Sequence, residues 1–220
     1  MSRPPSQKGT SVLPVVVALK QHPECKKLVP ESLWKYFDEP VIVSGWYPER
    51  DYWVLISALV STINPADVGG DVWRYFAKFS AERDIGGKKV VRAGSGDTAS
   101  AAGIYRTYAA VGRDDIETFF KRSTRLWSQY HDTGIMEIAG GRPATNAVLM
   151  RLSGFNIPIA GFVRLTGYYV EEYARLVGIE LRCTVERSTA NRDPCCEWDL
   201  RLARTPDTEA YVASLPPLRG

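Results

Sequence analysis

Two adjacent cysteines and two histidines are the residues of this chain whose chemistry could be catalytic or metal-binding. Cys195 and Cys196 lie in a run of alternating residues, so their side chains point to opposite faces and are poorly placed to bond to each other. His22 lies in a His-Pro-Glu turn and His131 at the expected end of a helix. Neither has a serine or cysteine nucleophile in a recognisable motif beside it. The favoured interpretation is a protein without a catalytic site, in which the cysteines are reduced thiols.

A glycine-rich segment superficially matches a nucleotide-binding fingerprint. Residues Gly94 to Ala99 read GSGDTA and follow Val90-Val91. That fingerprint binds a dinucleotide only where it joins a strand to a helix inside a βαβ unit, and no such unit surrounds it here. The four cysteines show no CxxC spacing and no partner histidine cluster, so they do not predict a metal site. We expect the glycine-rich segment to be a flexible loop.

The composition is that of an ordinary globular protein. The 220 residues include 28 Lys and Arg against 25 Asp and Glu, a formal charge of +3, which gives no electrostatic reason to expect a nucleic-acid partner. No apolar run approaches the roughly 18 residues that a membrane span needs, so we expect a cytoplasmic protein. The expected organisation is a flexible arm over 1–9, a single domain over 10–203 and a Pro-rich tail over 204–220.

The hydrophobic pattern changes from a helical to an alternating period after residue 130. Apolar residues at helical spacing predict helices over 10–21, 49–63, 72–83, 104–111, 114–130 and 158–177. Alternation predicts strands over 134–139, 144–155, 179–186 and 196–202, with Gly140-Gly141 as the turn of the first hairpin. This order predicts an α+β fold, in which N-terminal helices pack on an antiparallel sheet of about four strands with ββαββ order in the C-terminal half.

Short motifs along this order resemble a known superfamily. Lys8-Gly9-Thr10 before an apolar helix is similar to the start of heme nitric-oxide/oxygen-binding domains, and Trp46-Tyr47-Pro48 to a helix start in bacterial members. The ending, with Gly178 before a strand and Asp193 to Trp198 opening the last one, resembles the four-vinyl-reductase small-molecule-binding domain. The superfamily also holds the Bet-type subunits of the TRAPP vesicle-tethering complex. The resemblance spans residues 8 to 203 and implies an apolar cavity between helices and sheet.

The residues by which such relatives hold a cofactor are largely missing. In heme-binding members a histidine before the sheet ligates iron and a Tyr-x-Ser-x-Arg motif holds the propionates. The matching positions here are Trp127 and Arg151 to Phe155, which agree only at Ser153. Phenol-sensing relatives bind zinc with three cysteines and a glutamate, of which Cys196 alone matches. An indole cannot ligate iron, and a tetrahedral zinc site needs four ligands. We therefore expect neither heme nor zinc, and no other cofactor.

The aromatic residues are the remaining candidates for a functional site. Those expected to line the cavity, either as core or as ligand-binding residues, are Trp46, Trp73, Trp127, Tyr130, Phe162, Tyr168 and Tyr169. The leading hypothesis is a non-catalytic sensor or regulatory domain that binds a small hydrophobic or aromatic molecule and acts through a protein partner. The alternative is an interaction scaffold that dimerises around a solid interior. A third hypothesis, suggested only by the name of a related domain, is an accessory factor or reductase of pigment biosynthesis.

Overall fold

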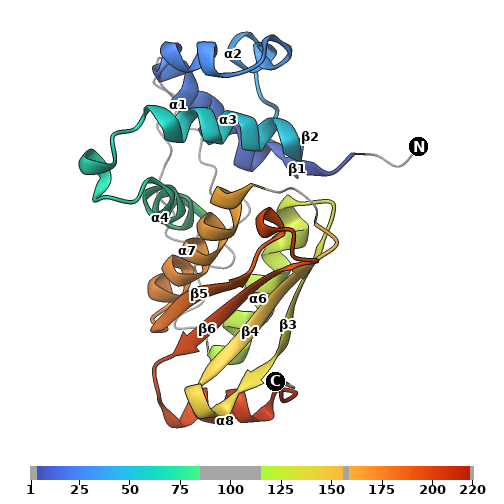
Figure 1. The fold of residues 1–220 in the computed structure, drawn as a ribbon, viewed down its shortest axis with the longest axis vertical. Helices are drawn as coiled ribbons and strands as arrows, with labels where there is room; N and C mark the ends of the chain where they lie inside the picture. The colour runs from blue at the N-terminus through green and yellow to red at the C-terminus, as the bar shows by residue number, and fades with distance from the viewer. Residues whose placement is uncertain (1–3, 85–114, 156–158, 219–220) are drawn as a thin grey trace.

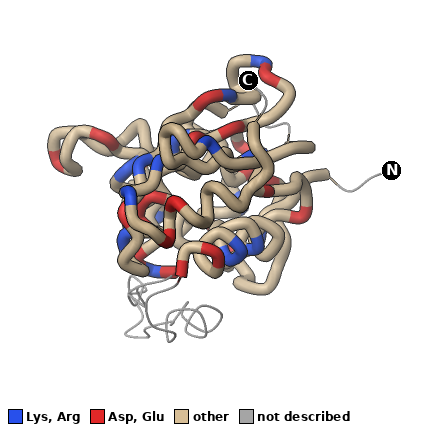
Figure 2. Tube along the Cα trace, turned by 90° about the horizontal axis from the view of Figure 1, so that it is seen from below, with Lys and Arg blue, Asp and Glu red and all other residues tan. Residues whose placement is uncertain are grey.

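A computed structural model describes residues 4–84, 115–155 and 159–218, which fold as a layer of helices followed by a mixed helix-and-sheet half (Figure 1). The expected loop over Gly94 to Ala99 and the expected helix over 104–111 lie outside the described residues. In the described part, no helix is long and apolar enough to cross a membrane. Lys and Arg are interspersed with Asp and Glu along it (Figure 2).

The N-terminal half is a helical layer tied together by a small two-stranded sheet. Its first and second strands pair antiparallel, and its helices α1 and α3 pack against each other. In chain order the elements are β1 (Ser6–Lys8), α1 (Gly9–Gln21), the 3-10 helices η1 (Pro23–Leu28) and η2 (Glu31–Leu33), α2 (Lys35–Asp38), β2 (Trp46–Pro48), α3 (Glu49–Thr62), η3 (Pro65–Val68) and α4 (Val72–Asp84).

The C-terminal half is built on a four-stranded antiparallel sheet with the order β3-β4-β6-β5. Its elements are α6 (Ile116–Tyr130), β3 (Ile135–Arg142), η5 (Pro143–Thr145), β4 (Ala147–Ser153), α7 (Ala160–Leu176), β5 (Leu181–Arg187), η6 (Thr189–Asn191), β6 (Cys196–Leu202) and α8 (Pro206–Ser214). Helix α7 lies beside α4, and α8 lies across the far end of the sheet (Figure 1). The predicted α+β class and ββαββ order are confirmed.

The two central strands have one apolar face and one charged face. Met150 of β4 and Trp198 of β6 are opposite each other and fully buried in the core. The Trp198 indole N–H donates to the backbone oxygen of Val163, at 2.9 Å, which fixes the start of α7 over the sheet. On the other face, Arg151 donates to Glu197 at 2.7 Å. The alternation read from the sequence therefore does place the apolar side chains of β6 inward.

The helix ends follow local signals in the sequence. The Asp115 carboxyl accepts hydrogen bonds from the backbone N–H and the hydroxyl of Thr118, at 2.7 and 2.9 Å, and caps α6. These hydrogen bonds hold the pKa of Asp115 below its usual value. After α7 the chain turns at Gly178, whose φ of +84° is one that glycine adopts without strain.

The expected flexible arm and surface tail are both more structured than the sequence indicates. Residues 6–8 of the arm form β1, in which Ser6 and Gln7 are each 3% exposed. The Ser6 backbone N–H donates to Asp132 at 2.6 Å. The Pro-rich tail contains α8, whose Val212 is fully buried. The arm was read as loose because it is polar, and the tail was placed at the surface because it is rich in proline. The partners of both segments lie far away in the sequence.

The first hairpin of the sheet turns at a different place from the one predicted. Gly140 and Gly141 lie inside β3, and the turn is formed by η5 and by Asn146, whose φ is +50°. A Cβ on Gly141 would lie 2.4 Å from the backbone oxygen of Val212. The two glycines therefore allow α8 and the segment after it to approach the sheet closely, which is a different use of glycine from a turn.

Helix α7 also approaches α4 through a glycine. A Cβ on Gly161 would lie 2.0 Å from Cζ2 of Trp73. We expect Gly161→Ala to lower the free energy of unfolding by about 1–3 kcal/mol, because the added methyl group displaces the indole. Helix propensity alone would favour alanine by about 1 kcal/mol. Urea unfolding measures the change, and the penalty should shrink in a Trp73→Leu background. A neutral or stabilising Gly161→Ala would contradict this packing.

Candidate functional site

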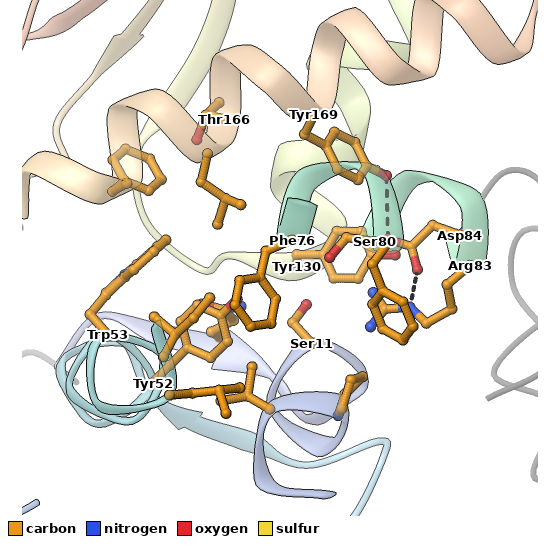
Figure 3. Close-up of a pocket in the computed structure, with 18 of the residues that line it drawn as sticks. Ser11, Tyr52, Trp53, Phe76, Ser80, Arg83, Asp84, Tyr130, Thr166 and Tyr169 are labelled. Carbon is orange, nitrogen blue, oxygen red and sulfur yellow. Dashed lines mark hydrogen bonds and ion pairs between the residues drawn. The ribbon is translucent and has the colours of Figure 1, made fainter. Parts of the chain in front are cut away.

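A cavity of about 570 Å³ lies where the N-terminal helices meet the C-terminal half. Side chains of α1 and α3 reach it from one side and those of α4, α6 and α7 from the other (Figure 3). Gln21, Tyr75 and Phe79 line it and are also exposed, so the cavity reaches the surface between α1 and α4. Its volume lies within the ~300–1,000 Å³ range of small-molecule sites.

Aromatic rings from four helices form the apolar wall. Trp53 of α3 packs edge-on against Phe162 of α7, with ring centroids 4.9 Å apart. Trp127 of α6 packs edge-on against the same ring at 5.8 Å. Phe76 of α4 also projects into the cavity (Figure 3). Such a wall offers dispersion and ring-edge contacts to an apolar or aromatic molecule.

One end of the cavity is polar and contains a buried ion pair. Arg83 Nε donates to Asp84 Oδ1 at 2.6 Å, and the two side chains are 6% and 7% exposed. The Tyr169 hydroxyl donates to Asp84 Oδ2 at 3.3 Å (Figure 3). Burial alone would lower the pKa of Arg83, but the Asp84 carboxylate overcomes this effect and holds that pKa above its usual value. The pair is therefore charged and internally neutralised.

Gln7 and Tyr52 continue this polar end toward the N-terminal layer. Burial raises the pKa of Tyr52, so its hydroxyl is neutral at physiological pH. The Gln7 side chain lies beside the Tyr52 hydroxyl and offsets part of this increase in pKa. The side-chain oxygen of Gln7 is buried and accepts no hydrogen bond from the described residues. The polar end thus contains a hydrogen-bond acceptor that the described protein leaves unsatisfied.

A buried carboxyl group joins the two halves beside the cavity. Glu49, the first residue of α3, is 0% exposed. Its Oε2 accepts a hydrogen bond from the Trp53 indole at 3.0 Å, and its Oε1 contacts Nδ1 of His131 at the end of α6. The His131 ring is stacked on Trp127 with centroids 3.7 Å apart. This group fixes α3 against α6 and so sets the width of the cavity.

The structure separates the aromatic residues that were expected to act together. Trp127, Tyr130, Phe162 and Tyr169 line the cavity, whereas Trp46, Trp73 and Tyr168 lie outside its lining. The Lys8 ammonium lies 4.6 Å from the Trp46 ring, and the Tyr168 hydroxyl donates to Asp71 at 2.9 Å. These two rings serve cation–π and hydrogen-bonding contacts elsewhere, because their positions on β2 and α7 face away from the cavity.

Several polar residues of the site were missed by sequence reasoning. Gln7 was placed in the arm, and Glu49 was included only as the start of a helix. Arg83 had a readable signal, because it follows Phe76 and Phe79 by seven and four residues and so lies on their face of α4. A charged residue on an apolar helix face indicates a buried partner, which here is Asp84.

Comparison with solved structures identifies this arrangement of helices and sheet. An H-NOX protein from S. oneidensis in the Fe(II) ligation state has a TM-score of 0.53 at 12% identity, over 91% of this chain and 98% of that one. An Fe(II) unliganded H-NOX mutant from K. algicida has a TM-score of 0.52 at 11% identity, over 90% and 98%. The chain has the H-NOX fold. A mutant T. tengcongensis H-NOX agrees, with a TM-score of 0.50 at 11% identity, over 90% and 99%.

The H-NOX likeness concerns the fold alone, because the sequences have diverged far. By sequence, no protein-family model and no curated protein matches the chain. The expected likeness to heme nitric-oxide/oxygen-binding domains is thus confirmed at the level of fold. The resemblance to the four-vinyl-reductase and TRAPP domains stays a prediction.

The cysteines lie apart from the cavity and are free thiols. Cys25, Cys183, Cys195 and Cys196 are unbonded to one another, and three of the four are buried. Burial raises the pKa of Cys183 and of Cys195, and the carboxylate of Glu197 adds to the effect at Cys195. Among the described residues, no group of three or more His, Cys, Asp and Glu side chains could hold a metal ion.

These thiols are expected to be poor nucleophiles, because Cys25 and Cys196 are fully buried and the pKa values of Cys183 and Cys195 are raised. A raised pKa leaves less thiolate at pH 8, and the thiolate is the species that attacks a disulfide. With Ellman's reagent at pH 8, we expect the folded protein to react at least about tenfold more slowly than the urea-unfolded protein, in which all four thiols should react. One fast-reacting thiol in the folded protein would contradict this assignment.

The buried carboxyl group can be tested by removing it. Glu49→Ala leaves the indole N–H of Trp53 and the Nδ1 of His131 without their partner, so we expect it to lower the free energy of unfolding by about 3 kcal/mol. Urea unfolding followed by circular dichroism measures the loss. Glu180→Ala, at an exposed position, is the matched control and should change stability by less than about 0.5 kcal/mol. Equal effects of the two variants would exclude the structural role given to Glu49.

Proposed function

We propose that the chain is a non-catalytic sensor or regulatory domain that binds a small hydrophobic molecule in the cavity between its two halves. The observation that supports this most is the cavity of about 570 Å³ itself, with aromatic walls and one polar end. An interaction scaffold needs no such space, because a core that serves stability alone is close-packed. H-NOX proteins with the same fold are described in Fe(II) and Fe(II)NO ligation states, so the fold is compatible with binding a ligand in its interior.

The described residues do not fit a heme, because its propionates would lack a cation. At the position of the propionate motif, Arg151 is bound to Glu197 on the charged face of the sheet, and Phe155 is 1% exposed in the core. Arg83 is the only Lys or Arg among the described residues that line the cavity, and Asp84 neutralises it. Two carboxylates buried without counter-charges would be strongly disfavoured.

The two histidines bear less on whether the cavity holds a heme than the missing propionate cation does. His22 lines the cavity, but it is 44% exposed and contacts Glu24 at 3.2 Å. His131 lines the cavity, but its Nδ1 contacts Glu49 and one ring face is covered by Trp127. A carboxyl partner at one ring nitrogen is compatible with metal ligation through the other. The missing propionate cation is therefore the argument on which the proposal of a ligand other than heme depends.

Filling the cavity tests the proposed function directly. Ser80 of α4 and Thr166 of α7 both line the cavity (Figure 3). In the double variant Ser80→Phe/Thr166→Phe, two phenyl rings occupy the ligand space, so the affinity for the neutral fluorescent probe N-phenyl-1-naphthylamine should fall at least about tenfold, which is about 1.4 kcal/mol. The control Ser128→Phe/Thr184→Phe adds the same rings at exposed positions and should keep wild-type affinity. Circular dichroism checks that both variants fold.

Two outcomes would overturn the proposal. The first is non-saturable probe binding that both double variants share, which would place the probe on the surface. The second is stoichiometric heme binding with a Soret band that is lost in His131→Ala, which would show that the cavity holds heme. Native mass spectrometry of the wild-type protein, before any probe is added, will show whether a ligand of a few hundred daltons is released on denaturation.

A further inference from the structure

The polar end of the cavity contains a glutamine whose hydrogen bonding the described residues do not complete. Gln7 is 3% exposed and lines the cavity, and its side-chain oxygen has no hydrogen-bond partner among the described residues. Buried side-chain oxygens in folded proteins are nearly always hydrogen-bonded. An exception on the wall of a cavity indicates that the missing donor belongs to whatever occupies the cavity.

Gln7 is held in place from both sides by its backbone. That backbone pairs with Tyr47 of β2 and bridges to His131 at the end of α6. The two pairings fix Gln7 at the polar end of the cavity, beside Tyr52. Its buried side-chain oxygen is the acceptor that the described residues leave without a donor.

The neighbouring charges indicate that the occupant is neutral. Arg83 and Asp84 are 6% and 7% exposed and bind each other at 2.6 Å, and the Tyr169 hydroxyl also donates to Asp84. The pair has no net charge to offer a carboxylate or an ammonium group. A charged ligand would lose its hydration without gaining a counter-ion, which is costly in an apolar site.

We infer that the cavity binds a neutral aromatic molecule with a hydroxyl or ring N–H group, whose hydrogen is donated to the side-chain oxygen of Gln7. This inference rests on the proposed function and narrows its ligand class. The aromatic body lies against Trp53, Phe162 and Trp127, whose rings form the wall. The donor group lies at the polar end, where it completes the hydrogen bonding of Gln7.

The test compares two probes that differ in the donor, 2-naphthol and 2-methoxynaphthalene, by isothermal titration calorimetry at pH 7. Gln7→Met keeps the length of the side chain and removes the acceptor. We expect it to weaken binding of 2-naphthol by about tenfold, since one net hydrogen bond is lost. Binding of 2-methoxynaphthalene, which has no hydrogen to donate, should change by less than about twofold. Unchanged affinity of Gln7→Met for 2-methoxynaphthalene would show that the cavity of the variant is intact.

Gln129→Met is the matched control. Gln129 lies on α6 and outside the cavity lining, so this variant should bind both probes as the wild type does. The inference would be overturned if Gln7→Met weakened the binding of both probes equally. It would also be overturned if the wild type bound 2-methoxynaphthalene more tightly than 2-naphthol and Gln7→Met removed that difference. In both cases the probes still bind, so the proposed function would stand. If neither probe binds the wild type, the proposed function and this inference both fail.

Discussion

The carboxyl group of Glu49 is the contact on which the arrangement of the two halves depends. It is completely buried and bonds to one group on each side, the Trp53 indole in the N-terminal layer and His131 at the end of α6. A polar group at that depth is tolerated only when its hydrogen bonds are made. This contact therefore favours the observed position of the N-terminal helices, in which α3 and α7 both line the cavity.

The packing of the two halves around Glu49 also explains why the cavity has an apolar body and a polar end. The helices that meet there present aromatic side chains to one another, and the rings of Trp53, Trp127 and Phe162 form the apolar body. The polar groups gather where β1 passes between the end of α6 and α3. Gln7 is fixed there by its backbone pairing with Tyr47 and His131. A ligand would therefore find shape and dispersion along the helices, and its one directional contact at the strand.

Much of the fold could be predicted from the sequence because its signals are local. Asp115 caps α6, Gly178 ends α7, and the alternation around Trp198 gives the buried face of β6. These features depend on residues within a few positions of each other. The predictions that failed concerned contacts between distant segments. Gly140-Gly141 was read as a turn because nothing nearby shows that α8 returns to the sheet at that point.

The candidate site divides in the same way. The sequence by itself determined that the interior is aromatic, and it placed Trp127, Tyr130, Phe162 and Tyr169 on helices whose apolar faces meet at the cavity. Only the tertiary structure decided that Trp46, Trp73 and Tyr168 face elsewhere, and that Gln7 belongs to the site. The physical reason is that periodicity reports which face of an element is buried, while the partner of a buried polar group is chosen by packing. Glu49 reaches His131 across a helix interface and Gln7 is placed by its strand, whereas Arg83 binds its neighbour Asp84, which Tyr169 of another helix also contacts.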